Sequence, residues 1–519
     1  MSKDVLEQAR KDIDAEIMVL QERITILRSS RNALVPIYRL PPELMVRIFR
    51  WLQRSYIYNG ETLVSLGANK SVLLPRWMRV TCVSQRWRNI ARSSATLHST
   101  IPTGNLRYAE EMLKRSGSAA LTLVDDESAS SWKNLARLQE LVIPVLPRFQ
   151  ALWLDSYIGN FILPRLESST PNLKELYIQN CTSVGTTPLP YSLRTLRSDF
   201  CAFKSFEWLS DLSNLVHLAL INPFGYTGER VALGVLLKAV DGMPRLISLE
   251  LTSTLKSPQV NQMSPIRPKL QYLRVIDTFH ILSQLLPWVE FADRFTVDIR
   301  CESTSNPQPA ADWAPVINLL DRRLKASSMV LRLAHFSWQD EDGSSSASIQ
   351  CSRTVGEAPC FLLRVPLKRG EARIWSKYAS AFPLDQVETL ITDGIWDSAD
   401  WRDSPWSDSR SIRRLTLSDK WTSSAYLQHL ANTRGHPSTG CMIFPSLEEL
   451  SLHGLHYSRD LQSKVQALLT ERMKRGVKLR RLVFGACSVS EDFVQQLLAI
   501  VDVVEQHGGT KAKKGSCNA

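Results

Sequence analysis

Two short stretches decide how the first hundred residues fold. Residues 38–52 read YRLPPELMVRIFRWL, and residues 77–92 read WMRVTCVSQRWRNIAR. In the first stretch, Pro41 and Pro42 suit the entry and first turn of a helix, where a missing N–H costs nothing. Glu43 suits the same turn, because the helix dipole favours a carboxylate there. The first stretch therefore predicts a helix with a marked beginning.

Both stretches carry apolar residues at helical spacing. In the first, Leu44, Ile48 and Leu52 recur every four residues, with Met45 and Phe49 beside them. This predicts an apolar stripe along one helix face. The second stretch is also predicted to be helical, with one face formed by Val80, Val83, Trp87 and Ile90. Two such short helices bury little by themselves, so we expect them to need each other and a partner.

Together the two stretches resemble the F-box. The resemblance rests on LPPEL at 40–44, IF at 48–49, VTCV at 80–83 and WRNIA at 87–91. It implies a three-helix module that docks on the Skp-type adaptor of an SCF ubiquitin ligase, while the rest of the chain chooses the substrate. The residues that it places at the adaptor, or in the core beside it, are Leu40, Pro41, Leu44, Ile48, Phe49, Val80, Val83 and Trp87.

One departure from the family's pattern is the segment 53–76, which replaces a usually short link. Such inserted loops occur in the fungal, basidiomycete-type branch of the family, and the insertion leaves the path of the second helix open. An ordinary helical hairpin at the start of a globular domain is the alternative interpretation of the same residues.

Length and composition limit the class of protein. A chain of 519 residues predicts two or more domains, or one elongated repeat domain. No apolar run approaches the ~18 residues that span a bilayer, and the polar N-terminus does not resemble a signal peptide, so we expect no membrane segment. The nine cysteines are odd in number and lack Cys-x-x-Cys spacing, which favours a reducing cytoplasmic or nuclear location.

The net charge of +12 raises the question of a nucleic-acid partner. The Lys and Arg residues are dispersed, and only the run KAKK at 511–514 forms a cluster. No basic stripe with interleaved aromatic residues stands out. We therefore do not expect nucleic-acid binding and keep it as a third hypothesis.

Residues 4–32 predict one helix with an apolar seam and charged flanks. The seam residues repeat at spacings of four, three, four and three, as in a coiled coil, and are Ile13, Ile17, Leu20, Ile24 and Leu27. Two interpretations stay open. The helix self-associates as a short coiled coil, or it folds back onto the following helices or the neighbouring domain.

Beyond residue 103 the chain follows a repeated template, Leu-x-x-Leu-x-Leu-x-x-Cys/Asn. Full copies begin at Leu173 and Leu479, and the copy that begins at Leu193 has one weak position, Ser198. Partial copies begin at Leu215, Leu246, Leu270, Ile412 and Leu447. A spacing of about 20 to 35 residues is typical of leucine-rich repeats. Each copy predicts a short strand with its leucines inward, and the last Cys or Asn in a turn. Because one copy cannot bury its apolar face alone, the copies must stack.

This part resembles the irregular leucine-rich-repeat domains of F-box proteins. The alternative is an α/β domain with leucine-rich parallel strands.

The segments between and before the copies are predicted from simpler signals. Helices are expected at 105–115, 131–146, 231–240, 461–474 and 491–505, and strands at 120–124, 294–300, 328–336 and 359–367. The last two strands are predicted to pair as a hairpin, because 339–348 reads as a solvated Asp/Gly/Ser-rich loop. Residues 303–311 read as another exposed loop.

The outward positions of the repeat strands form the candidate substrate-binding face. Aromatic and Arg side chains on such a face are common interface anchors. The residues predicted to contact a substrate are Tyr177, Arg197, Asp199, Glu250, Tyr272, Arg274, Arg414, Glu449 and Arg481. Whether a substrate must carry phosphate stays open.

No catalytic constellation stands out. The sequence has no phosphate-binding Gly-rich loop, no Gly-x-Ser-x-Gly elbow and no His-Glu-x-x-His motif. His453 and His456 read as turn or surface histidines, and Cys181, Cys201 and Cys487 follow the repeat. We expect no enzyme activity, no metal and no cofactor.

The resulting prediction is an α/β protein with an N-terminal helix and a three-helix F-box, followed by an irregular leucine-rich-repeat solenoid. The domains are 1–35 (helix or short coiled coil), 36–102 (F-box), 103–505 (repeat domain) and 506–519 (disordered basic tail). The function implied by the resemblance is the substrate-recognition subunit of an SCF-type cullin-RING ubiquitin ligase. Its partners would be a Skp-type adaptor, through it a cullin, and a protein substrate. The alternative is a leucine-rich-repeat scaffold outside the ubiquitin system, dimerised by residues 4–32.

Overall fold

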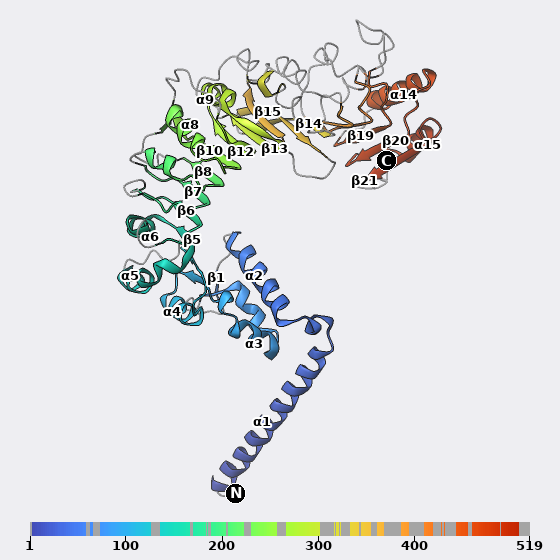
Figure 1. Ribbon diagram of the computed structural model, residues 1–519. Helices are drawn as coiled ribbons and strands as arrows, with labels where there is room; N and C mark the ends of the chain where they lie inside the picture. Colours follow the sequence, from blue (N-terminus) through green and yellow to red (C-terminus); the bar gives the residue numbers. More distant parts are fainter. Residues whose placement is uncertain are drawn as a thin grey trace. The chain divides into compact units, whose positions relative to one another are not determined.

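The computed structural model has two compact units, Met1–Thr195 and Leu196–Ala519, each described by itself (Figure 1). The described residues are 3–58, 63–65, 73–125, 135–166, 170–182, 184, 188–203, 206–222, 230–256, 266–301, 316, 318–320, 322, 333–341, 344–353, 361–367, 386–393, 409–418, 427, 430, 443–454, 459–487 and 489–507. The predicted loop at 303–311 lies outside them.

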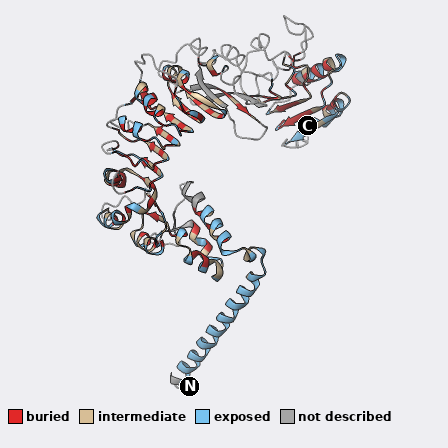
Figure 2. Ribbon diagram, in the orientation of Figure 1, coloured by how far each residue is buried: buried red, intermediate tan, exposed pale blue. Residues whose placement is uncertain are grey.

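The first unit begins with the predicted N-terminal helix. Helix α1 (Lys3–Ala33) runs through the whole of residues 4–32 and is followed by the 3-10 turn η1 (Pro36–Arg39). The seam side chains of α1 are exposed along the helix (Figure 2). Within the first unit, these side chains therefore do not pack against the other described elements. Self-association of α1 and its packing on the neighbouring domain both stay predictions.

A helical module follows, made of α2 (Pro42–Tyr58), η2 (Arg76–Cys82), α3 (Gln85–Ser93) and η3 (Ala95–Leu97). The prediction of one continuous second helix was wrong. The hydroxyl of Ser84 accepts a hydrogen bond from the N–H of Trp87 at 3.2 Å, which caps α3 and separates it from η2. Val80 is buried in the same core as Ile90, whereas Val83 is exposed, so the four predicted residues do not form one helix face. In the inserted segment, β1 (Leu63–Ser65) and β2 (Leu73–Pro75) pair antiparallel.

The rest of the first unit is a parallel sheet with helices on one side (Figure 1). Its strands pair in the order β3 (Thr100–Pro102), β4 (Leu121–Val124), β5 (Phe149–Leu154) and β6 (Glu175–Gln179). Its helices are α4 (Leu106–Arg115), α5 (Leu135–Val142), η6 (Ile143–Arg148), α6 (Ser156–Ile162) and η7 (Leu163–Arg165). The helix predicted at 131–146 ends at Val142 and passes into η6, where Pro144 and Pro147 lack the N–H that an α-helix needs.

The second unit continues with parallel strands. They are β7 (Thr195–Asp199), β8 (His217–Ile221), β10 (Ser248–Thr252), β12 (Lys269–Asp277) and β13 (Glu290–Cys301). The connecting elements are η8 (Glu207–Asp211), β9 (Val231–Ala232), α8 (Leu233–Asp241), β11 (Leu255–Lys256), α9 (Phe279–Leu285) and η9 (Leu286–Trp288). The short strands β9 and β11 pair with each other in parallel.

The predicted hairpin in the middle of the chain has a different pairing. Strand β15 (Ser344–Ser352) lies between β14 (Leu333–Glu341) and β16 (Phe361–Leu367) and pairs antiparallel with both. The loop predicted at 339–348 was therefore wrong, since most of it belongs to β14 and β15. Backbone ladders on both sides satisfy the N–H and C=O groups of β15, so a Ser-rich sequence is accepted there. Strand β16 continues the sheet from β13, and β14 pairs in parallel with β17 (Thr389–Asp393).

The last strands are again parallel. They pair in the order β17, β18 (Arg414–Leu417), β19 (Glu449–His453), β20 (Arg481–Gly485) and β21 (Val503–His507). Helix α14 (Arg459–Lys474) precedes β20, and α15 (Glu491–Leu498) precedes β21. The helix predicted at 491–505 ends earlier, and residues 506–507 belong to β21 rather than to a tail. Residues 508–519 lie outside the described residues.

The repeat template is confirmed by burial and by backbone conformation. In the copy that contains β6, the first three apolar positions, Leu173, Leu176 and Ile178, are buried, and the strand residues Glu175 and Tyr177 face outward. The residue directly after each of six strands has a positive φ, which bends the chain sharply out of the sheet. These residues are Asn180, Phe200, Asn222, Ser253, Gly454 and Ala486.

The final template position serves this turn. The Cys181 thiol donates to the carbonyl oxygen of Gln179 at 3.3 Å, and Cys487 does the same toward Gly485 at 3.1 Å. Thr254 replaces the cysteine after β10 and donates to the carbonyl of Thr252 at 3.0 Å. A small buried donor is therefore what the position requires. The described strands form a mixed α/β fold with parallel pairing, consistent with a solenoid-like repeat.

Candidate protein-binding surfaces

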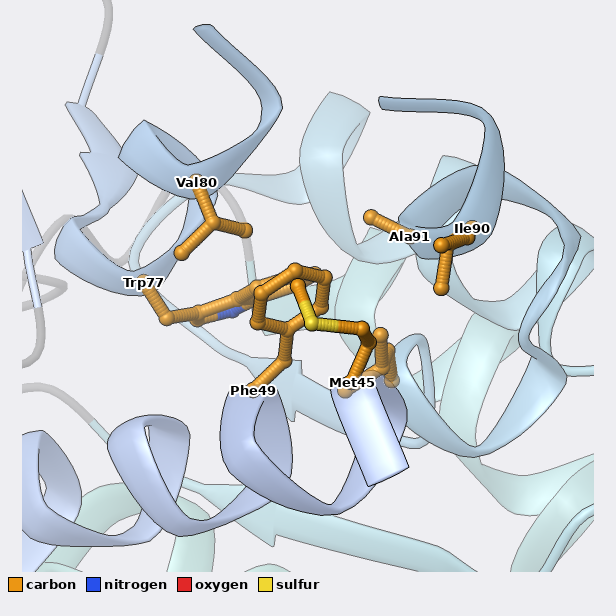
Figure 3. Packing of buried hydrophobic residues seen from close by; sticks show 7 residues of the cluster. Met45, Phe49, Trp77, Val80, Ile90 and Ala91 are labelled. Carbon is orange, nitrogen blue, oxygen red and sulfur yellow. The ribbon is translucent and has the colours of Figure 1, made fainter. Parts of the chain in front are cut away.

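The helical module has a small core of its own (Figure 3). Its buried side chains come from α2, η2, α3 and η3 and are Met45, Phe49, Trp77, Val80, Ile90, Ala91 and Leu97. The Phe49 ring lies 5.3 Å from the Trp87 ring, measured between centroids. Trp87 and Leu40 are partly buried against the same cluster. The module therefore holds a defined shape through contacts within about sixty residues.

Polar contacts tie the module's entry to α3. The Arg86 guanidinium donates to the carbonyl oxygens of Tyr38 and Leu40, the second at 2.8 Å, and lies over the Tyr38 ring. The buried amide of Gln53 donates to the carbonyl of Leu97 at 3.3 Å. These bonds satisfy carbonyls that the 3-10 turns leave without helical partners.

The predicted adaptor-binding residues divide into two groups. Phe49 and Val80 are buried in the core, so they support the module and do not present a contact surface. Leu44 and Ile48 are each 41 % exposed, and Val83 is 55 % exposed. Pro41 is exposed as well, at the beginning of α2.

The exposed apolar residues of α2 form a row that ends at an aromatic residue. Leu44, Ile48 and Trp51 are spaced four and three residues apart, so they lie on one side of the helix. Trp51 was missed as a candidate contact, although its spacing from Ile48 indicates the same face. We call these three side chains the α2 apolar row. Large apolar side chains held in water on one face favour a protein partner.

The outward face of the first unit carries an aromatic pair and a pocket. The Tyr177 ring lies 4.4 Å from that of Trp153 on the neighbouring strand, a residue that the template did not mark as a site. A pocket of about 310 Å³ lies between α2 and the strands, lined by Arg50, Trp153 and Lys174 among others. Its lining mixes charges and hydroxyls and identifies no cofactor.

In the second unit, four of the predicted face residues meet in one charge network. The Arg197 guanidinium lies 3.1 Å from the Asp199 carboxylate and 3.4 Å from that of Glu250. The other oxygen of Glu250 lies 2.9 Å from the guanidinium of Arg274. Ala219 stands opposite Glu250 in the register of β8 and β10, so its short side chain leaves Arg197 room to reach across.

The network extends to two residues that sequence reasoning did not select. Arg274 Nε lies 3.3 Å from Asp298, which in turn lies 3.0 Å from Arg300 Nε. Asp298 faces Arg274 in the register of β12 and β13. The strand at 294–300 was predicted, but its outward residues, Asp298 and Arg300, were not included among the candidates for the binding face. Burial raises the pKa of Asp199 above its ordinary value, against the opposing effect of Arg197.

A second cluster lies on the last strands. The Arg481 guanidinium lies 3.4 Å from Glu449 and 2.6 Å from Glu505, and His507 lies 3.1 Å from the same Glu505. The side-chain hydrogen bond from Arg481 lowers the pKa of Glu505. Glu505 had been assigned to a helix and was therefore missed.

These pairings limit what the face can recognise. Arg197, Arg274 and Arg481 each contact carboxylates of the chain itself, so a substrate phosphate would have to displace them. Tyr272 lies on β12 next to this network, and burial raises the pKa of its hydroxyl. Arg414 faces Glu449 in the strand register. The face thus presents a fixed pattern of paired charges rather than a cluster of open cations.

Two further findings concern chemistry and membranes. Within the part of the chain that the structure describes, no group of three or more His, Cys, Asp and Glu side chains is placed to hold a metal ion. His456 lies outside the described residues. That His453 and His456 are turn or surface histidines therefore stays a prediction. None of the described helices combines the length and apolarity needed to cross a bilayer.

Comparisons with known proteins give one distant structural match to report. No protein-family model and no curated protein sequence matches the chain. Among solved structures, the chain is similar to the one titled "Crystal structure of TLR13-ssRNA13 complex", with 12 % identity and a TM-score of 0.31. The match covers 71 % of this chain and 44 % of that chain, so this protein spans less than half of that relative's length. The chain's own strands define it as a mixed α/β repeat protein.

Proposed function

We propose that this chain is the substrate-recognition subunit of an SCF-type cullin-RING ubiquitin ligase. The helical module acts as an F-box and binds a Skp-type adaptor, which connects it to a cullin. The repeat strands bind a protein substrate. A separate ubiquitin-conjugating enzyme performs the chemistry, and this chain contributes proximity by raising the effective concentration of the substrate lysine.

The observation that carries the proposal is that α2 has two adjacent columns of apolar side chains, one buried and one exposed. Met45 and Phe49 fill the core, while Leu44 and Ile48, one position before each, remain in water. A helix that buries one apolar column and exposes the adjacent one has a second surface to cover. The F-box resemblance places Leu44, Ile48 and Val83 at the adaptor or in the core beside it, and these three are among its residues that stay exposed.

The outward face of the repeat strands supports the substrate-binding half of the proposal. Its charged side chains are held by several partners each, as for Glu250 between Arg197 and Arg274. Such pre-organised charges favour selection of a complementary partner more than tight binding. We infer that the substrate presents alternating charges, and that an obligatory phosphate is not required.

The test is adaptor binding by the purified full chain. The variant Leu44→Asp/Ile48→Asp places two carboxylates on the α2 apolar row without changing the core. A matched double-aspartate control is Arg107→Asp/Lys114→Asp, because both residues are exposed on α4, outside the module. We expect adaptor affinity in the parent and the control, and a loss of at least a hundredfold in the α2 variant. The absence of binding by the parent would overturn the proposal.

The alternative is a repeat-protein scaffold outside the ubiquitin system, and the exposed seam of α1 favours it. A parent chain that self-associates but never binds the adaptor would select this alternative.

A further inference from the structure

The seam of α1 is the longest apolar surface that the described chain leaves in water. Its side chains are between 45 % and 62 % exposed and are Leu6, Ile13, Ile17, Leu20, Ile24 and Leu27. Most of the stability of a helix in a protein comes from the packing of its apolar face, and this face of α1 packs against no other described residue of its unit. The seam therefore needs an occupant.

The heptad pattern identifies the kind of occupant. Ile17 and Ile24 fall at position a, and Leu6, Ile13, Leu20 and Leu27 fall at position d. The flanking e and g positions are mostly charged or polar, as in Glu7, Glu16, Arg23 and Arg28. A seam limited by charges on both edges is narrow, and it fits one other helix of the same kind.

The charges decide the direction of that second helix. Residues 3–17 carry five acidic and three basic side chains, whereas residues 18–33 carry one acidic and three basic. The two halves are thus net −2 and net +2, from 3 − 5 and 3 − 1. In an antiparallel pair each negative half lies beside a positive half, which is attractive. The two helix dipoles also point in opposite directions, which is favourable for neighbouring helices.

The individual charge pairs between the two helices also favour the antiparallel direction. With Ile17 of one helix opposite Leu20 of the other, Glu16 faces Arg23 and Glu7 faces Arg28, each twice by symmetry. In a parallel pair, position g faces position e of the next heptad, so Arg23 would face Arg28. The a-position arginines, Arg10 and Arg31, would also each face their own copy. Like charges so placed destabilise a helix pair.

We propose that α1 pairs with α1 of a second copy of this chain as an antiparallel two-helix coiled coil. The paired segment runs from Leu6 to Leu27, with Ile17 and Leu20 at its centre. Arg10 and Arg31 close its two ends opposite Leu27 and Leu6, with their aliphatic stems on the apolar seam and their charges in water. This inference does not depend on the proposed ligase function.

The experiment is sedimentation equilibrium of the full-length chain from about 1 to 200 μM, a range chosen because a three-heptad pair is weak. The parent is expected to dimerise reversibly. The variant Ile17→Asp/Ile24→Asp is expected to stay monomeric, and these exposed positions support no other part of the described fold. A monomeric parent across the whole range, or a parent trimer or tetramer, would overturn the proposal.

Direction is tested by charge reversal. Arg23→Glu should weaken the antiparallel dimer by roughly tenfold, because two attractive contacts become repulsive. Lys11→Glu is the matched control, with the same charge change at an outer position, and should leave the dissociation constant within about twofold.

Mixing completes the test. Arg23→Glu chains combined with Glu16→Arg chains should recover the parent's affinity, since each Arg then faces a Glu across the pair. In a parallel dimer, Arg23→Glu would instead face Arg28 and tighten binding. A tighter Arg23→Glu dimer would therefore refute the antiparallel arrangement.

Discussion

Replacing Phe49 by Ala and, separately, Leu44 by Ala should have very different effects, although both side chains are large, apolar and on one helix. Phe49 is 1 % exposed, and its ring packs against Trp87 and the core cluster. Removing a buried ring in such a core costs about 3–5 kcal/mol, from lost transfer energy and the cavity left behind. Leu44 has no comparable burial, and a change on such a surface stays within about 0.5 kcal/mol.

The assay must report on the module alone, because a chain with two compact units does not unfold in one step. Hydrogen exchange of peptides from α2 and α3, followed by mass spectrometry, measures local opening. At about 1.36 kcal/mol per tenfold, the Phe49→Ala amides should exchange roughly a hundred to several thousand times faster. The Leu44→Ala amides should exchange within about threefold of the parent.

Peptides from β20 (Arg481–Gly485) are the internal control and should exchange at the parent's rate in both variants. If Phe49→Ala exchanged in α3 no faster than Leu44→Ala, the separation into buried and exposed columns would be refuted. The distinction matters for function. A Phe49 variant that lost a partner would report on folding, whereas a Leu44 variant would report on contact.

Two further predictions concern the first unit. Burial lowers the pKa of His98 below its ordinary value, so on acidification the unfolded chain binds a proton before the folded chain does, and stability falls as the pH drops below about 6.5. His98→Gln can still donate to the carbonyl of Ala91, and it should lose less thermal stability between pH 7.5 and 5.5 than the parent; an equal loss would contradict this account. Gly159→Ala would direct a methyl group at the buried Cys181 sulfur and should cost about 1–3 kcal/mol of local stability, measured by hydrogen exchange of peptides from α6. The double variant Gly159→Ala/Cys181→Ala should be more stable than the sum of its single changes predicts, and simple additivity would argue against the contact.

The elements of this protein follow largely from local patterns. The a/d spacing of 4–32, the entry signals at Pro41 and Pro42, and the leucine template each predicted the type of element that the structure contains. Even the cysteine after a repeat strand was expected in a turn. Such signals are readable because helix and strand periods place apolar residues on one face wherever the chain will be packed.

Errors occurred where polar composition and backbone pairing disagree. Residues 344–352 are Ser-rich and were interpreted as a loop, yet they form the central strand of three. Two repeat strands were also missed, because Phe149 and Val387 stand where the template has Leu. Both positions are buried, so any large apolar side chain satisfies them.

The sequence by itself determined the type of most helices and repeat strands, which of their residues alternate outward, and that residues 4–32 form a helix with an apolar seam. Only the tertiary structure decided which of two adjacent apolar columns on α2 becomes core, since Leu44–Ile48 and Met45–Phe49 are equivalent until Trp77 and α3 cover one of them. It alone also joined Arg197 to Glu250 and Asp298 to Arg274. Those pairs lie on different strands, and their meeting depends on the register between strands, which is set by packing along the whole sheet.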